Sequence, residues 1–290
     1  GSITSFDTIA FDAGDHWAVV GAFGGFSGDT IRDFAQGDSI VLSGATGISS
    51  SLSGTTLSLT SGDTTETLSF TAPSGGTVQV QTVGSNTVIT LVPCFVVGTN
   101  IATPTGEVPA ETLQVGDEVL TILGEVLRVV WTGSRMIDCA RHDAQDQVCP
   151  VRIAVDAFAP AVPHRDLYLS PDHAVLAHGV LIPIKYLVNG TTITQASPVQ
   201  VTYHHVELSR HAVMVAEGLA AESFLDTGDR SVLGIGRWPT EESFEAPGAD
   251  VQFLRDALAC APVRVIGPEV DRVRSRLAQR AARMVPAVAA

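Results

Sequence analysis

The sequence predicts a mainly β protein, with an amino-terminal β sandwich or roll, a second all-β domain and a short helical carboxy-terminal tail. Residues 1–93 are rich in Gly, Ser and Thr, and turn residues separate short β-branched runs about every 8–12 positions. Residues 94–236 keep this strand pattern with glycines as breaks, whereas residues 237–290, a linker and tail, contain the helical periodicity. A length of 290 residues suits two domains of about 100–200 residues each.

The amino-terminal segment contains β-branched runs at residues 18–20, 39–42, 56–59 and 87–91. Residues 28–42 resemble the segment that ends calcium-binding repeat rolls in secreted bacterial proteins. In this stretch Asp29, Asp33 and Asp38 offer the oxygen ligands that calcium prefers. The full glycine-rich repeat is absent, so acidic turn residues on a solvated strand edge are the favoured alternative.

Charge is distributed unevenly along the chain, whose formal net charge is −14. The first 93 residues contain one base, Arg32, against eight acids, so this segment would repel nucleic acid. From residue 250 onward seven arginines face four acids. Apolar runs stay below roughly 18 residues, so no membrane span is expected. Gly1-Ser2 resembles a cloning remnant, and a natural leader or upstream region is expected to be missing.

The tail is expected to form one amphipathic helix that begins near Pro268 and Glu269. Its apolar residues recur at steps of three and four positions: Val270, Val273, Leu277, Ala281 and Met284. Arginines cover the other sides. Such a helix either touches a membrane or an export machine, or packs on the domain before it, which is the commoner outcome.

Asn189-Gly190 is the strongest turn signal in the second domain. Because it lies between two short apolar or β-branched runs, it predicts a tight β-hairpin. A structural turn is favoured over any cyclisation of Asn189.

Four cysteines are too few for a disulfide scaffold. Cys139 and Cys149 lie ten positions apart and form either a disulfide in an exported protein or two buried thiols. Cys260 in the tail is expected to be a small apolar filler. The remaining cysteine, Cys94, stands in a different context.

Cys94 stands in mid-chain, directly after the amino-terminal segment, and opens the run Cys94-Phe95-Val96-Val97-Gly98-Thr99. A nucleophile at such a junction can attack the peptide bond on its own amino-terminal side. Two further stretches follow in order, at residues 169–176 and 201–208. In the first stretch a hydroxyl residue precedes a histidine by three positions.

The three blocks together resemble those of the Hint (Hedgehog/intein) self-processing domains, in their bacterial intein-like form, over roughly residues 94–230. The resemblance implies a bent, pseudo-symmetric all-β domain that processes its own chain. It also implies a secreted or cell-surface bacterial protein with an adhesin-like or repeat-type segment upstream. The resemblance implies neither a nucleic-acid partner nor a required cofactor.

The resemblance implies that the Cys94 sulfur attacks the Pro93 carbonyl carbon and converts the Pro93-Cys94 peptide bond into a thioester. The amide nitrogen leaves only when it is protonated, and His173 is the candidate general acid. Ser170 is expected to hydrogen-bond the scissile amide or carbonyl. Asp172 either orients His173 or belongs to an ordinary turn.

His205 stands where many inteins carry an aspartate, and it is expected to assist deprotonation of the cysteine or to stabilise the tetrahedral intermediate. His204 would point to the opposite face of an extended strand. His211 is either part of the site or only holds a loop. For each of these histidines the competing interpretation is a buried core histidine, and for Cys94 it is a packed thiol.

An intein ends in His-Asn, whose asparagine cyclises, but this chain has Glu222-Ser223 at that place. The sequence therefore predicts no splicing and a single turnover in which residues 1–93 are released to water or transferred to an external nucleophile. One alternative is an extracellular calcium-dependent or adhesive module beside an inert Hint domain. A cysteine hydrolase acting on other proteins is the weakest alternative, because Cys94 is already bonded to its substrate.

Overall fold

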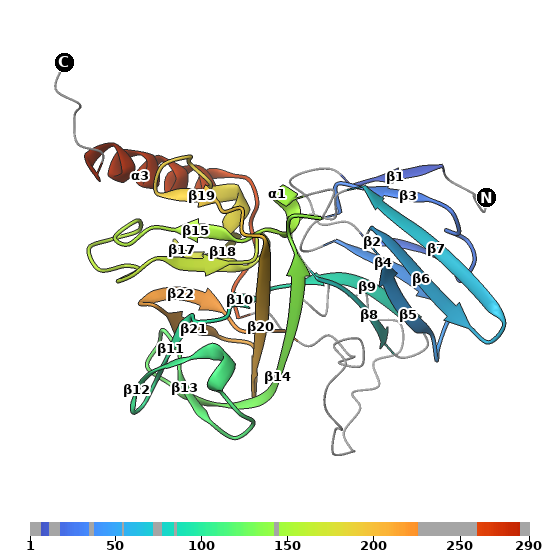
Figure 1. Cartoon of the computed structure of the whole chain (residues 1–290), viewed down its shortest axis with the longest axis horizontal. Helices are drawn as coiled ribbons and strands as arrows, with labels where there is room; N and C mark the ends of the chain where they lie inside the picture. The colour runs from blue at the N-terminus through green and yellow to red at the C-terminus, as the bar shows by residue number, and fades with distance from the viewer. Residues whose placement is uncertain are drawn as a thin grey trace.

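The computed structural model describes residues 7–11, 18–34, 38–53, 55–71, 77–83, 86–141, 145–225 and 260–284. Strands dominate these residues and fall into two lobes that lie side by side (Figure 1). The amino-terminal lobe comprises β1–β9, and the carboxy-terminal lobe comprises β10–β22 together with the carboxy-terminal helix. The predicted mainly β fold class is confirmed.

The amino-terminal lobe consists of a five-stranded sheet, in the order β1-β3-β7-β6-β5, and a four-stranded sheet, in the order β2-β4-β9-β8. Its strands are β1 (Thr8–Ala10), β2 (Ala18–Ala22), β3 (Thr30–Arg32), β4 (Ser39–Ser43), β5 (Ser49–Ser53), β6 (Thr56–Ser61), β7 (Thr64–Thr71), β8 (Thr77–Val83) and β9 (Asn86–Val92). The first four strands alternate between the sheets, so β1 pairs with β3 and β2 with β4 in parallel. The four β-branched runs coincide with β2, β4, β6 and β9, which confirms those predictions.

One apolar core joins the two sheets of the amino-terminal lobe. Ile31 and Leu59 from the larger sheet share a buried cluster with Ile40 and Ile89 from the smaller one. Alternate side chains of a strand point to opposite faces, so each sheet contributes one face to this core. The lobe is therefore a sandwich with roll-like connections.

The carboxy-terminal lobe contains a seven-stranded sheet, β13-β14-β20-β10-β16-β15-β19, and a six-stranded sheet, β12-β11-β21-β22-β17-β18. Its strands are β10 (Phe95–Val96), β11 (Asn100–Thr103), β12 (Gly106–Pro109), β13 (Glu118–Leu120), β14 (Val126–Asp138), β15 (Val151–Ile153), β16 (Leu167–Leu169), β17 (Ala174–Ala177), β18 (Val180–Pro183), β19 (Ile193–Gln195), β20 (Gln200–Leu208), β21 (Val213–Ala216) and β22 (Leu219–Glu222). The long strands β14 and β20 form an antiparallel ladder with an irregularity between Val129 and Trp131.

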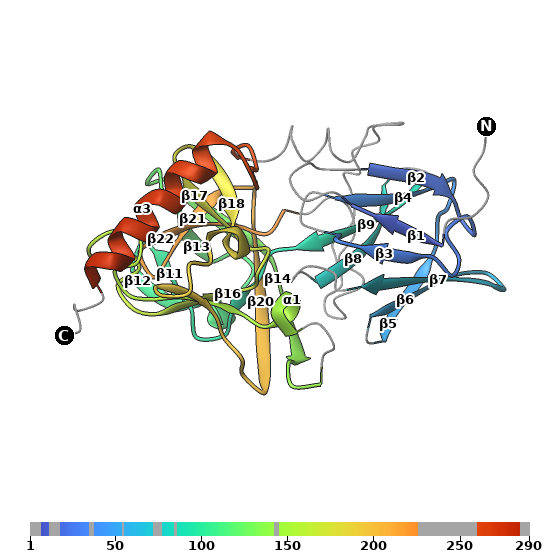
Figure 2. The same cartoon turned by 90° about the horizontal axis from the view of Figure 1, so that it is seen from above.

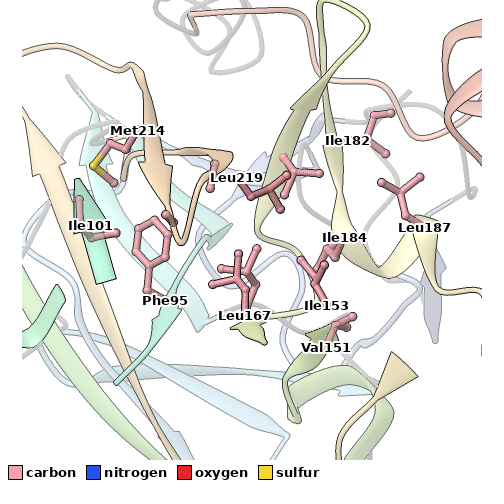
Figure 3. Packing of buried hydrophobic residues seen from close by; sticks show 14 of the residues in the cluster. Phe95, Ile101, Val151, Ile153, Leu167, Ile182, Ile184, Leu187, Met214 and Leu219 are labelled. Carbon is pink, nitrogen blue, oxygen red and sulfur yellow. The ribbon is translucent and has the colours of Figure 1, made fainter. Parts of the chain in front are cut away.

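Phe95, directly after the predicted nucleophile, anchors the start of this lobe. Its ring belongs to the central apolar cluster with Ile101, Leu167 and Met214, and it is 1% exposed (Figure 3). Burying such a ring contributes roughly 1.5–3 kcal/mol relative to leaving it exposed. Cys94 is therefore attached to a residue that cannot move without disturbing the core.

The tail forms the predicted amphipathic helix, α3 (Pro268–Met284). Val270, Val273 and Leu277 are buried in the same cluster as the strands of the carboxy-terminal lobe. Arg274 Nε donates a 2.8 Å hydrogen bond to the Tyr186 carbonyl oxygen. The helix thus packs along the carboxy-terminal lobe (Figure 2), as the docking interpretation predicted.

The segment around Asn189-Gly190 differs from the prediction. The hairpin at Asn189-Gly190 is wrong: a 3-10 helix, η2 (Ile184–Leu187), precedes this turn, and β19 after it pairs with β15. The Asn189 Oδ1 atom accepts three backbone N–H groups and closes the turn by itself. Helical turns also occur at η1 (Ala110–Thr112) and α1 (Gln145–Val148), outside the tail.

The predicted domain boundary at residues 236 and 237 falls outside the described residues. The boundary at Cys94 falls between β9 and β10, which belong to different sheets. In the part of the chain that the structure describes, no helix is both long and apolar enough to cross a membrane.

Candidate functional site

The register of three neighbouring strands gathers the predicted site around Cys94. Strand β10 lies between β16 and β20, and Phe95 is paired with Leu169 on one side and with His204 on the other. Ser170 directly follows Leu169, and His205 directly follows His204. Cys94 itself is 1% exposed, and Ser170 and His205 are fully buried, so the thiol, the hydroxyl and the imidazole meet in the protein interior.

Ser170 holds both sides of the Cys94 residue. Its hydroxyl oxygen accepts the Cys94 N–H at 3.0 Å, and its own backbone N–H donates to the Cys94 carbonyl oxygen at 3.1 Å. The Cys94 nitrogen belongs to the Pro93-Cys94 peptide bond. Ser170 therefore contacts the scissile amide at the nitrogen, one of the two contacts that the sequence predicted.

His205 contacts both reacting groups of the Pro93-Cys94 junction. Its Nδ1 atom lies 2.9 Å from the Pro93 carbonyl oxygen, and its Nε2 atom lies 3.5 Å from Cys94 Sγ. A carbonyl oxygen only accepts hydrogen bonds, so the ring proton is on Nδ1. The Nε2 lone pair then faces the thiol.

The environment keeps His205 neutral. Burial lowers its pKa to about 4, although the contact with Pro93 opposes this shift. Trp131 and Phe224 pack around the ring, with centroids 6.1 and 5.6 Å from it. A neutral imidazole in fixed orientation is the form that can accept a proton from a thiol.

His173 lies between the two ends of this β domain. Its Nε2 atom lies 3.1 Å from the Glu222 carbonyl oxygen, which means that Nε2 carries the proton. Burial lowers the pKa of His173, while the Glu222 charge and hydrogen bonds with the backbone of Cys94 and Glu222 oppose the shift. The Phe95 ring packs against it at 4.3 Å between centroids.

The remaining predicted residues have other partners. Asp172 is fully buried and forms a 2.7 Å ion pair with Lys185. His211 accepts the Cys260 N–H at 3.1 Å through Nδ1, and its Nε2 atom lies 3.4 Å from a Glu222 carboxylate oxygen. Burial alone would lower the pKa of His211, but Cys260 and Glu222 raise it to about 9. These contacts match the alternative in which His211 holds a loop.

The carboxy-terminal end of the domain is held by a closed set of hydrogen bonds. Besides its contact with His211, the Glu222 side chain accepts the Ala174 N–H at 2.9 Å. The Ser223 hydroxyl oxygen accepts the Ala212 N–H at 3.1 Å. Both Glu222 and Ser223 are buried.

All four cysteines are free thiols. Cys139 and Cys149 are both buried, and burial together with the neighbouring Cys149 raises the pKa of Cys139 to about 12. This agrees with the interpretation as two packed thiols. Cys260 is exposed, so its interpretation as an apolar filler is wrong. The contact of Cys260 with the domain is made by its backbone, whose N–H donates to His211 Nδ1.

Sequence reasoning missed one charged neighbour of the nucleophile. Arg135, on β14 opposite Tyr203, interacts electrostatically with Cys94. Burial lowers the pKa of this guanidinium, and the interaction with Cys94 opposes the shift. The only signal in the sequence is a basic residue inside a long strand pattern, which is too common to be diagnostic.

The calcium interpretation of Asp29, Asp33 and Asp38, which the sequence ranked second, finds no support, and the favoured interpretation as solvated turn residues fits only Asp33. Asp29 and Asp38 are buried and Asp33 is exposed. Among the described residues, the one group of three metal-ligating side chains lies in the carboxy-terminal lobe and contains none of these aspartates.

An all-β domain that begins at a buried cysteine, beside a histidine that contacts its thiol, is the arrangement of a self-processing domain. Residues 93–228 match the family model described as a Hint domain. This segment of the chain belongs to the Hint family. No curated protein matches the chain.

Solved structures with similarity to the chain include three inteins or intein-like domains. The MchDnaB-1 intein is 16% identical, with 44% of this chain and 98% of the intein covered and a TM-score of 0.33. The bacterial intein-like domain from Clostridium thermocellum is 15% identical, with coverages of 45% and 97% and a TM-score of 0.27. The DnaB intein from Synechocystis sp. PCC 6803 is 10% identical, with coverages of 45% and 98% and a TM-score of 0.30.

Proposed function

We propose that this chain cleaves or transfers its own amino-terminal segment through an N–S acyl shift at Pro93-Cys94. The observation that carries the proposal is the placement of His205, with one ring nitrogen at the Pro93 oxygen and the other at the Cys94 sulfur. One side chain thereby addresses both the nucleophile and the carbonyl that it attacks.

In the first step the Cys94 thiol gives its proton to His205 Nε2, and the sulfur forms a bond to the Pro93 carbonyl carbon. Negative charge develops on the Pro93 oxygen, 2.9 Å from Nδ1. Because protonation at Nε2 makes the ring a cation, the Nδ1–H group becomes a stronger donor as this charge appears. The developing oxyanion also raises the affinity of His205 for the proton that it receives.

In the second step the carbon–nitrogen bond breaks and leaves a thioester between Pro93 and Cys94, with a free amino group on Cys94. The nitrogen must gain a proton, and His173 interacts with the backbone of the same residue. Because its lowered pKa leaves His173 neutral, it must first take up the proton that His205 received from the thiol. Once protonated, the ring is a ready donor and passes that proton to the Cys94 nitrogen, so that the step balances. Ser170 accepts the existing N–H and so stabilises the nitrogen as it becomes positively charged.

The thioester is then resolved by water or by an external nucleophile, without splicing. Cyclisation of an asparagine would be needed to free the other end, and Glu222-Ser223 occupies that place. The next residue, Phe224, packs on His205 and has no nucleophilic atom to receive the acyl group. The proline ring of Pro93 crowds the attacked carbonyl, so we expect a slow or gated reaction.

The intact mass of the purified full-length protein, followed over time with and without dithiothreitol, tests this proposal. We expect a fragment that ends at Pro93, formed faster with the thiol. If full-length protein persists unchanged under both conditions, the Hint domain is inert and the chain belongs with binding modules. We also propose that the protein is secreted or lies on the cell surface of a bacterium. Fractionation of the host culture should then find it in the extracellular or cell-surface fraction.

A further inference from the structure

A second cluster of chemistry-bearing side chains lies in the Hint domain, built by Glu107, His164 and Glu217. Glu107 comes from β12, His164 from the loop before β16, and Glu217 from the turn between β21 and β22. Segments 110 residues apart in sequence thus converge on one point. None of the three residues takes part in the proposed acyl shift.

Two of the three distances between these side chains suit ligands around one small cation. His164 Nε2 lies 3.1 Å from a Glu107 carboxylate oxygen and 3.1 Å from the Glu217 Oε2 atom. The three ligand atoms all lie within 4.8 Å of one another. Ligands at about 2.0–2.1 Å from a tetrahedral zinc ion are themselves roughly 3.3 Å apart.

Glu217 gives the cluster an independent reason to bind a cation. Its side chain is fully buried, and Oε1 accepts the Asn100 N–H and pairs with Arg165, both at 2.5 Å. The other oxygen, Oε2, is buried, points to His164 and has no hydrogen-bond partner among the described residues. A buried carboxylate oxygen without a hydrogen bond is costly unless a charge compensates it.

The charge balance also leaves room for a cation. Two carboxylates, of Glu107 and Glu217, face the single guanidinium of Arg165, which pairs with Glu217 Oε1 and leaves Oε2 directed at His164. With a neutral His164 the cluster has one net negative charge. A divalent cation would reverse this sign to a single positive charge, a small imbalance near the surface.

The backbone holds the cluster in place. The His164 N–H donates to the Glu217 carbonyl oxygen at 2.9 Å, and Glu217 adopts a positive φ of 49°. Gly218 follows with φ of 82°, where a Cβ atom would lie only 3.1 Å from His164 Nδ1. Glycine is therefore required at this position for the imidazole to approach the turn.

We propose that Glu107, His164 and Glu217 bind a divalent cation of the Zn²⁺ class, with one coordination position open to water. One imidazole nitrogen and two carboxylate oxygens are ligands that zinc accepts in proteins. The bound ion would clip β12 and the His164 loop to the β21–β22 turn. It would stabilise the Hint domain in proportion to its affinity and concentration.

Calorimetric titration with zinc chloride tests this site. The full-length Cys94→Ala variant is the background, because it keeps the chain intact and removes the thiol of the acyl-shift site as a competing ligand. In this background His164→Gln and Glu107→Gln change the proposed ligands at partly exposed positions. His178→Gln and Glu118→Gln are matched controls, because both residues are exposed and lie outside the cluster.

We expect one zinc equivalent to bind to the background protein and to both controls, and to raise their melting temperatures. Affinity should fall at least about tenfold in His164→Gln and Glu107→Gln, since losing even a supporting group of a metal ligand costs about 10–100-fold. Equal affinity in all five proteins would assign the zinc to other ligands and overturn the proposal. The same holds if none of them binds zinc, which would leave His164 as an ordinary partner of two carboxylates.

Discussion

The two ends of the Hint domain meet at the same histidines but carry different chemistry. At the amino-terminal end, Cys94 has a thiol beside His205 and an amide nitrogen on Ser170. At the carboxy-terminal end, the Glu222 carboxylate and the Ser223 hydroxyl are already engaged with backbone N–H groups. Under the proposed function, the amino-terminal end is arranged for bond breaking, whereas the carboxy-terminal end is held by hydrogen bonds.

His173 and His205 both touch the two ends. His173 contacts the Glu222 carbonyl and the backbone of Cys94, and the ring of His205 packs against Phe224 while it contacts Pro93. Proximity to these histidines is therefore insufficient for reaction. The asymmetry lies in the thiol at position 94 and in the lack of a cyclising asparagine at positions 222–224.

The largest effect is expected from Cys94→Ala, which removes that nucleophile. No scission should occur at this junction, because no other group lies where the thiol was. Mass spectrometry of the folded variant checks this. A fragment that still ends at Pro93 would mean that another group attacks the bond.

His205→Leu should follow, because it removes two functions at once. Losing a general base costs about 10²–10⁴-fold, and losing an oxyanion donor costs about 10²–10³-fold, so cleavage should slow by at least about 10⁴-fold. Cleavage rates from timed intact-mass measurements give the comparison. His204→Leu is the matched control on the adjacent residue, and equal slowing in both variants would remove the special role of His205.

His173→Ala should slow thioester formation by about 10²–10⁴-fold, the range for a lost acid–base group. Full-length precursor should accumulate, and the chain should remain uncut after Ser223, although the Glu222 carbonyl loses its partner. His178→Ala, at an exposed histidine, controls for a general effect of losing an imidazole. Cleavage at the unaltered rate in the His173 variant would return His173 to a structural role.

The smallest effect concerns stability against acid. The buried His205 has a pKa of about 4, below the value of about 6.5 in an unfolded chain, so between these pH values the unfolded state binds the extra proton. Stability should therefore fall as pH decreases through this window, by about 2 kcal/mol between pH 7 and pH 5 from this group. Urea unfolding at pH 7 and pH 5 gives the change in the free energy of unfolding, which should be smaller for His205→Leu than for the unaltered protein. An unchanged value would show that His205 does not cause the loss of stability.

Much of this architecture was readable in the sequence, because the signals are local. The strands β2, β4, β6 and β9 and the helix α3 follow from β-branched runs and from apolar spacing. The hairpin at Asn189-Gly190 was misread, because the Asn189 side chain can close a turn without a preceding strand. Turn residues predict that the chain reverses, whereas strand pairing depends on partners distant in sequence.

The candidate residues Cys94, Ser170, His173 and His205 were chosen because they lie in three sequence blocks that resemble those of the Hint family, and their catalytic roles remain predictions. Contacts that depend on register between distant strands were not predictable. The electrostatic interaction of Arg135 with Cys94 and the link from His173 through Glu222 to His211 both depend on such register. The cluster of Glu107, His164 and Glu217 was not predictable from the sequence either, because its members lie in three separate segments.

Trapping with hydroxylamine tests the central claim, that only the amino-terminal end reacts. The full-length protein is incubated with hydroxylamine, which attacks thioesters, and the intact masses of all products are measured. The account predicts two products: residues 1–93 with a hydroxamate on Pro93, and residues 94–290 in one piece. A break next to Ser223, or a species in which residues 1–93 are joined to the tail beyond Phe224, would contradict it.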